Sequence, residues 1–137
     1  MEEHNVKDLL DLSGKIALVS GGAQNLGKDI AAGLLEAGAT VIVTSRNLEH
    51  AEQWAAENGR NFPGKTFGMA LDVASEVSVI ECFAAIKKQF GRLDILVNNA
   101  VTHSHDETGI LETEPLHAFK ACIDVNLTGV FLMMREY

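Results

Sequence analysis

The sequence predicts an α/β fold built on a doubly wound parallel sheet. Short apolar segments alternate along the 137 residues with longer segments that read as helices. An apolar run without polar alternation is typical of a strand that is buried on both faces. Strands separated by helices indicate parallel pairing with helices on both faces of the sheet. A chain of this length can bury the core of one such domain.

The element boundaries follow from the apolar runs and from the residues that start helices. We expect strands at Ile16–Ser20, Thr40–Thr44, Thr66–Leu71 and Leu93–Asn98, and helices at Leu26–Ala37, Leu48–Asn58, Glu76–Phe90 and Leu116–Arg135. Asn47 and Ser75 precede two of these helices and are residue types favoured as N-caps. Residues 1–13 are expected to form a polar leader and residues 14–137 the folded domain.

Composition excludes several classes of function. The net charge of −8 argues against a general nucleic-acid or acidic-membrane surface. No signal peptide and no membrane span are expected, so we predict a cytoplasmic protein. Cys82 and Cys122 are isolated and read as buried free thiols. His103–Glu107 contains an H-x-H pattern, but it lacks the ligand spacing of metal sites, and we predict no metal.

A glycine-rich segment, Ser20–Lys28, lies between the first predicted strand and the first predicted helix. Glycines there allow a tight turn and a close approach of backbone N–H groups to a phosphate, and the helix N-terminus adds partial positive charge. The strand that follows this helix completes a βαβ unit of about 30 residues, the context of a Rossmann-type dinucleotide site. Asp29 follows Lys28 where a Walker loop has Ser or Thr. The segment therefore predicts a nucleotide diphosphate ligand.

Four segments in order resemble the motifs of the short-chain dehydrogenase/reductase family. Ser20–Gly27 is similar to its Thr-Gly-x-x-x-Gly-x-Gly cofactor loop, and Leu71-Asp72-Val73 to its adenine-contacting acidic position. Asn98-Asn99-Ala100 is similar to its Asn-Asn-Ala-Gly motif, and Asp124–Gly129 to the segment that holds its helix asparagine. The resemblance implies a Rossmann-type doubly wound sheet with strand order 3-2-1-4, and an NAD(P)(H)-dependent oxidoreductase that acts on a small carbonyl or alcohol.

The resemblance also implies a role for each matching residue. The expected cofactor-binding residues are Gly21, Gln24, Asn25, Leu26, Gly27, Ser45, Arg46, Asp72, Val73, Asn98, Asn99 and Ala100. Asp72 would accept a hydrogen bond from the adenine amino group. The alternative is that Asp72 only caps the helix that follows it. Asn126 would be the catalytic asparagine, holding a water in a proton relay to the active-site lysine.

Apolar residues recur at helical spacing in the last predicted helix and form one face that includes Phe119, Ile123, Leu127, Val130 and Met134. Asn126 lies beside that face, so we expect a buried amide that needs hydrogen-bond partners, for which a neighbouring backbone kink is the alternative partner. The family packs this helix at a subunit interface, which implies a homotetramer or homodimer. Burial within one subunit is the alternative.

Cofactor choice depends on the end of the second strand, about 20 residues after the glycines. An acidic residue there would bond the ribose 2′-hydroxyl and repel a 2′-phosphate, and this chain has Ser45 and Arg46 instead. The Arg46 guanidinium can bind phosphate oxygens, so NADP(H) is favoured, with NAD(H) as the other cofactor. A solvated loop cation is the alternative interpretation of Arg46. A methyltransferase with a similar start is disfavoured, because it would carry an acidic residue here.

Two residues depart from the family pattern. Asn25 replaces the middle glycine of the loop, and asparagine tolerates a left-handed backbone better than most residues. Val101 replaces the glycine after Asn-Asn-Ala and would be strained if that position requires positive φ.

In the family, a serine and a Tyr-x-x-x-Lys pair follow the segment that matches this chain. Tyr137 is the only tyrosine, has no lysine four positions later and is not expected to be catalytic. A 137-residue product would leave Leu93–Val97 as an uncovered sheet edge, so it would fold poorly or dimerise there, unless the chain is part of a longer enzyme. The alternative function is a truncated, non-catalytic dinucleotide-binding or interaction module.

Overall fold

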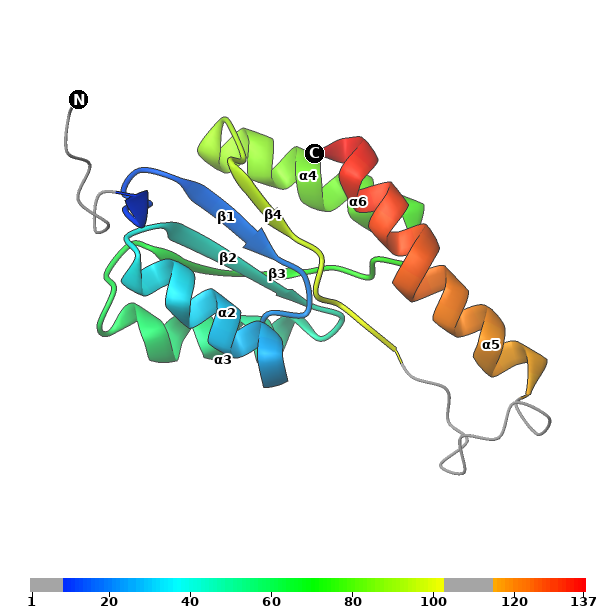
Figure 1. Ribbon diagram of the computed structural model, residues 1–137. Helices are drawn as coiled ribbons and strands as arrows, with labels where there is room; N and C mark the ends of the chain where they lie inside the picture. Colours follow the sequence, from blue (N-terminus) through cyan, green and yellow to red (C-terminus); the bar gives the residue numbers. More distant parts are fainter. Residues whose placement is uncertain (1–8, 103–114) are drawn as a thin grey trace.

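A four-stranded parallel sheet with the order β3-β2-β1-β4 forms the centre of the molecule (Figure 1). The computed structural model describes residues 9–102 and 115–137. The strands are β1 (Ile16–Val19), β2 (Thr40–Ser45), β3 (Thr66–Ala70) and β4 (Ile95–Val97). The predicted α/β class and the 3-2-1-4 order are therefore confirmed.

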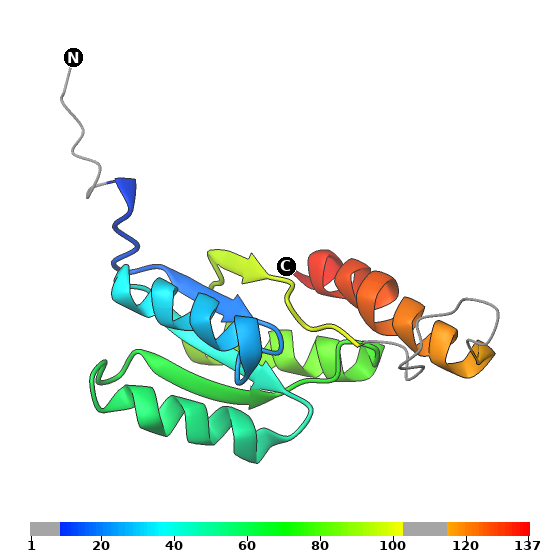
Figure 2. The ribbon, with the colours of Figure 1, turned by 60° about the horizontal axis from the view of Figure 1, so that its bottom comes forward.

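Helices cover both faces of this sheet. Helices α2 (Asn25–Glu36) and α3 (Leu48–Gly59) lie on one face, and α4 (Glu76–Phe90) and α6 (Val130–Glu136) lie on the other (Figures 1 and 2). Each face has its own buried cluster, and successive residues of β1 divide between them, since Ala17 and Val19 face α2 and α3 whereas Leu18 faces α4 and α6. This double burial explains why the central strands read as continuous apolar runs.

The helix starts confirm the predicted caps. The Asn47 carboxamide oxygen accepts from Glu49 N at 3.0 Å, and the Ser75 hydroxyl accepts from Ser78 N at 3.3 Å. Cys82 is buried, and its burial raises the pKa of the thiol to about 11. Cys122 is only partly buried, so the expectation of two buried thiols holds for Cys82 alone.

The last predicted helix differs most from its expectation. It consists of α5 (Leu116–Ile123), a π-helical segment η2 (Asp124–Gly129) and α6. Helix α5 projects past the sheet, and α6 packs against α4, where Arg135 pairs with Glu76 at 2.8 Å (Figures 1 and 2).

The apolar face of α5, η2 and α6 is therefore exposed in this chain, against the expectation of burial. Its most exposed large apolar side chains are Leu116, Phe119, Leu127, Phe131 and Met134, each more than half exposed, and Ile123 is 39 % exposed. Asn126 is exposed as well, so the expected buried amide is wrong for this chain. Whether this face is buried within one subunit or at a subunit interface stays a prediction.

The same helix bears on the expectation that no segment could span a membrane. Leu116–Glu136 runs for 21 residues with a mean hydropathy of 1.3 in its most apolar window, so it is long and apolar enough by length and composition. One such helix is weak support for a membrane span, because helices of soluble domains meet the same criterion.

Hydrogen bonds of Asp94 join the amino ends of β1 and β4, at the end of the sheet opposite the glycine loop. The Asp94 carboxylate accepts from Ile16 N at 2.9 Å and from Arg92 Nε at 3.1 Å. The Tyr137 hydroxyl donates to the Asp94 carbonyl at 2.8 Å, which places Tyr137 at the amino end of β4. Because the Asp94 side chain takes the Ile16 N–H, β4 begins at Ile95 and not at the predicted Leu93.

We predict that Asp94→Asn makes the folded state less stable in a pH-dependent way. The hydrogen bond from Ile16 N–H, followed by the charges of Arg92 and Lys15, lowers the pKa of the Asp94 carboxyl. A lowered folded-state pKa contributes stability above the unfolded pKa, and this contribution is lost as the pH falls through the lowered value.

Urea unfolding should therefore show a lower midpoint for Asp94→Asn at about pH 7, with the difference from the parent shrinking by about pH 3. Glu52→Gln, which neutralises an exposed carboxylate on α3, is the control. A difference that is independent of pH would contradict the role given to the Asp94 charge.

Candidate functional site

The glycine-rich segment forms the turn from β1 into α2 at the carboxyl edge of the sheet. Gly21 has φ 64° and Asn25 has φ 48°, both in the left-handed region. Asn25 is the only non-glycine residue with positive φ in the described residues, so asparagine does supply the backbone of the missing glycine. Val101 does not adopt positive φ, and the strain considered for it is absent.

The N-terminus of α2 is open, in that no side chain caps its first N–H groups. Gln24 occupies the N-cap position without a side-chain cap, and no acidic residue lies in the first turn of this described helix. The first N–H groups of a helix need partners, and their partial positive charge favours an anion. An anionic group bound at this turn would satisfy both requirements.

Gly27 allows the loop to close on its neighbours. A Cβ atom at this position would overlap the Asn99 amide and the Gly21 carbonyl, so no larger residue fits without a shift. Helix α2 therefore begins in direct contact with the turn and with the end of β4, which is the close approach that a phosphate cradle requires.

Ser20 and Asn99 hold this turn against the end of β4. The buried Ser20 hydroxyl accepts from Asn99 N and Ala100 N at 3.0 Å each and donates to the Val97 carbonyl at 3.3 Å. The Asn99 amide nitrogen donates to the Ser20 carbonyl at 2.9 Å and to the Gly21 carbonyl at 3.3 Å. All three hydrogen-bonding capacities of the serine hydroxyl are used. We refer to Ser20 and Asn99 with these bonds as the loop clamp.

The end of β2 presents Ser45 and Arg46. The Ser45 hydroxyl accepts from Asn47 N at 3.2 Å, and the Arg46 side chain is exposed. These residues share the carboxyl edge of the sheet with the glycine turn, because β1 and β2 pair in parallel with Val19 opposite Val43.

The end of β3 presents Asp72 and Val73. The Asp72 carboxylate accepts from Ala74 N at 3.0 Å, and its backbone N donates to the Ser78 hydroxyl at 3.0 Å. Ser75 caps α4, so the alternative role of Asp72 as the cap of that helix is contradicted. Val73 packs against Gly129, where a Cβ atom would lie 3.0 Å from the Val73 side chain.

Asn126 lies in η2 and faces the segment that leaves β4. Its amide oxygen accepts from Thr102 N at 3.0 Å, and its amide nitrogen donates to the Thr102 carbonyl at 2.9 Å. With these two bonds the Asn126 side chain pairs with the Thr102 backbone as a neighbouring strand would. The bonds match the alternative interpretation, in which Asn126 bonds neighbouring backbone. A π-helical turn is common where a functional residue is re-aimed.

The remaining predicted residues lie partly within and partly outside the described part of the chain. Asn98 is exposed beside Ala100 at the end of β4, next to Val73 and Gly129. Leu26 is 67 % exposed at the start of α2. His103–Glu107 lies outside the described residues. Within residues 9–102 and 115–137, no three His, Cys, Asp or Glu side chains come close enough to hold a metal ion.

A glycine turn at the carboxyl edge of a parallel sheet, before an uncapped helix, is the arrangement typical of dinucleotide-binding α/β domains. A model of the family described as short chain dehydrogenase matches residues 15–137. The chain belongs to the short-chain dehydrogenase family, whose homologues are NAD(P)-dependent oxidoreductases.

Two curated relatives illustrate the likeness. The chain is 34% identical over 121 residues to 2-(R)-hydroxypropyl-CoM dehydrogenase of Xanthobacter autotrophicus, with 88% of this chain and 48% of the relative covered. It is 37% identical over 129 residues to D-threitol dehydrogenase of Mycolicibacterium smegmatis, with 90% and 46% covered. The chain thus spans about half the length of the curated relatives it matches.

Solved structures give the same picture. The Pseudomonas aeruginosa RhlG/NADP complex matches with a TM-score of 0.83 at 34% identity, covering 93% of this chain and 48% of that one. A gluconate 5-dehydrogenase from Burkholderia cenocepacia, solved with NADP and tartrate, matches with a TM-score of 0.85 at 30% identity, covering 96% and 50%. A Brucella melitensis 3-ketoacyl-(acyl-carrier-protein) reductase complexed with NADH has a TM-score of 0.83 at 31% identity, covering 92% and 49%.

Sequence reasoning named Asn99 as a cofactor residue and missed its bonds to the loop. It also missed the structural role of Ser20, whose hydroxyl links β1 to β4. A polar residue directly after β1 and another two residues after β4 were the available signal, since parallel neighbours bring their carboxyl ends together. The predicted contact of Asn99 with a cofactor stays a prediction.

We predict that Ser20→Ala lowers the free energy of unfolding by about 1–3 kcal/mol, because two backbone N–H groups lose their acceptor. Thr44→Val is the matched control: the Thr44 hydroxyl is buried without a hydrogen-bond partner, so its removal should be neutral or stabilising by up to roughly 1 kcal/mol. Urea unfolding of both variants measures the contrast. Equal losses would contradict the hydrogen bonding described for the loop clamp.

Proposed function

We propose that this chain binds a nicotinamide dinucleotide at the carboxyl edge of its sheet and forms the cofactor half of an oxidoreductase. The single observation that carries the proposal is the open N-terminus of α2, which the loop clamp holds next to the glycine turn. The cradle fits a pyrophosphate, since Gly27 leaves no room for a side chain where the turn closes.

Each part of the cofactor has candidate partners along this edge. The turn from Gly21 to Gly27 would hold the pyrophosphate, with Gln24, Asn25 and Leu26 contributing the first amides of α2. Asp72 and Val73 would hold the adenine, and Asn98 to Ala100 would lie along the ribose and nicotinamide. The described bonds of Asp72 use its Oδ1 atom and leave Oδ2 for the adenine amino group.

NADP(H) is the proposed cofactor, ahead of NAD(H). Ser45 and Arg46 stand where an acidic residue would repel a 2′-phosphate, and Arg46 is exposed at the strand end. Two of the neighbouring structures carry NADP and one carries NADH, so both cofactors occur among them.

The proposed reaction moves a hydride between the nicotinamide and a small carbonyl or alcohol. The nicotinamide supplies the hydride chemistry when bound. Asn126 is the proposed positioning residue of the proton path, and its amide is already fixed by two bonds to Thr102. The described tyrosine, Tyr137, donates to Asp94 at the amino end of β4 and is not placed for this chemistry.

We further propose a cytoplasmic protein with no nucleic-acid or membrane partner that associates as a homodimer or homotetramer. The exposed apolar face of α5, η2 and α6 supports association, because large exposed apolar patches mark interaction surfaces.

Calorimetric titration of the chain with NADP+ and with NAD+ tests the proposed cofactor site. We expect micromolar binding of NADP+ and weaker binding of NAD+, because only NADP+ presents a 2′-phosphate to Arg46. No binding of either dinucleotide would contradict the proposed function.

We predict that Arg46→Ala weakens NADP+ binding about tenfold or more and leaves NAD+ binding nearly unchanged, since a charge-assisted bond contributes roughly 1.5–3 kcal/mol. Arg60→Ala is the control, because it removes an equally charged exposed side chain at the other end of α3. Equal losses for the two dinucleotides would show that Arg46 does not contact the 2′-phosphate.

We predict that Phe131→Asp reduces self-association at least tenfold, because it places a charge in the exposed apolar face. Phe131 is 57 % exposed, and Val77, which is 65 % exposed on α4, gives the matched control Val77→Asp. Light scattering after size-exclusion chromatography measures the mass. A parent chain that is monomeric, or a variant that associates as the parent does, would contradict assembly through this face.

A further inference from the structure

Asn25 has a backbone conformation that glycine would adopt at lower cost. Its φ is 48°, and it is the first residue of α2, directly after the N-cap residue Gln24. Glycine has no Cβ and adopts positive φ freely, whereas asparagine tolerates it better than most residues but still meets steric resistance. Conformations of this kind cluster at ligand-binding turns. A residue with a side chain at such a position indicates that the side chain has a function of its own.

The Asn25 carboxamide does not help to hold the turn together. The side chain is exposed, and it makes no hydrogen bond within residues 9–102 and 115–137. The bonds that fix the turn come from the Asn99 amide, which donates to the Ser20 and Gly21 carbonyls. Asn47 shows what an asparagine at a helix start does when it has a structural role, since its side chain caps α3 by accepting from Glu49 N at 3.0 Å. The Asn25 donors therefore remain available to a ligand.

The surroundings of Asn25 favour a negatively charged ligand. Helices α3 and α4 each begin with a side-chain cap and an acidic residue in the first turn, Glu49 and Glu76, whereas α2 has neither. The partial positive charge of the α2 N-terminus is thus not compensated by a carboxylate of its own first turn. The Asn25 carboxamide adds two N–H donors to the backbone N–H groups at the same place. Side-chain and backbone donors together suit an anion with several oxygens.

We propose that the Asn25 carboxamide nitrogen donates a hydrogen bond to the pyrophosphate of the dinucleotide. This inference rests on the proposed function and goes beyond it, because there Asn25 contributes only its backbone amide. A bond from an amide N–H to a charged phosphate oxygen is charge-assisted and stronger than one between neutral groups. The side chain then explains why asparagine occupies a position whose backbone suits glycine, since glycine would supply the turn without the donor.

Asn25→Gly is the direct test, because glycine keeps the positive φ and removes only the carboxamide. Calorimetric titration of the chain with NADP+ should show binding about five- to tenfold weaker than in the parent, as expected for one lost bond to a charged group. Adenosine 2′-monophosphate is the second probe, since it has the adenine, the ribose and the 2′-phosphate but no pyrophosphate. Its affinity should be the same for the variant and the parent.

Asn25→Asp separates binding from stability. Aspartate has nearly the same shape and also tolerates a left-handed backbone. Its carboxylate would repel the phosphates, so NADP+ should bind at least tenfold more weakly than to the parent. The same carboxylate interacts favourably with the N-terminus of α2, so the urea midpoint should equal or exceed that of the parent. A residue with a merely structural role would not show weaker binding together with undiminished stability.

Asn61 gives the matched control, because it is an exposed asparagine in the turn between α3 and β3. Asn61→Gly and Asn61→Asp should bind NADP+ as the parent does. Unchanged or tighter NADP+ binding by folded Asn25→Gly overturns the proposal, and so do equal losses of affinity for NADP+ and adenosine 2′-monophosphate. In either case the parent still binds NADP+ and the proposed function stands. A parent chain that binds no dinucleotide overturns the proposed function, and this inference with it.

Discussion

The position of the glycine turn depends on one group of hydrogen bonds, those of Ser20 and Asn99. They join two strands that are adjacent in space but separated by nearly eighty residues in sequence. Ser20 follows β1 and Asn99 follows β4, so the bonds form only when the parallel pairing of these strands is in register. The turn that would cradle a phosphate is therefore a product of the whole sheet, not of the local glycines. This is preorganisation at low entropic cost, because the donors are fixed before any ligand arrives.

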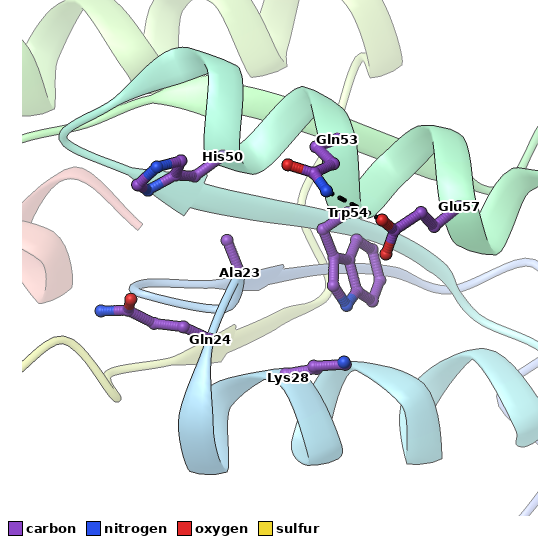
Figure 3. A pocket seen from close by; sticks show the side chains of 7 residues that line it. All are labelled: Ala23, Gln24, Lys28, His50, Gln53, Trp54 and Glu57. Atoms are coloured by element: carbon purple, nitrogen blue, oxygen red, sulfur yellow. Dashed lines mark hydrogen bonds between the residues drawn. The ribbon is translucent and has the colours of Figure 1, made fainter.

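The two faces of the sheet support different parts of the proposed function. The α2–α3 face holds the proposed cofactor turn at its edge and, between the two helices, a cavity lined by residues that include Lys28 and Trp54 (Figure 3). The α4–α6 face ends in η2, where Asn126 joins Thr102 and Gly129 packs on Val73. An extra residue in a helical turn shifts the side chains that follow it, so the π-helical segment allows Asn126 to reach Thr102 while α6 still packs against α4. The exposed apolar residues of this helix are spread over α5, η2 and α6.

Much of this architecture could be predicted from the sequence, for identifiable reasons. The central strands can be recognised as continuous apolar runs because both of their faces are buried. Asn47 and Ser75 mark helix starts because a side-chain cap depends only on residues nearby in the sequence. The left-handed backbone of Asn25 could also be predicted, since tolerance of positive φ is an intrinsic property of asparagine. The start of β4 was harder to predict, because Asp94 replaces a strand contact with a side-chain bond to Ile16, a residue 78 positions away.

The misreadings share one physical origin, which is dependence on packing that sequence spacing does not reveal. Apolar spacing in Leu116–Arg135 predicts a buried face whatever covers it, and here the described chain does not cover it. Asn126 was expected to be buried for the same reason, and it is exposed. The bonds of the loop clamp were missed because they join residues that are distant in the sequence.

The central claim is that the clamped turn between β1 and α2 is where this chain receives the phosphates of a dinucleotide. Mapping backbone amide resonances during titration with NADP+ tests it most directly. The account predicts that the largest changes fall on the amides from Gly21 to Gly27, with further changes at Ser45, Arg46 and Asp72. Unchanged amides across that turn, with changes elsewhere or nowhere, would contradict the account.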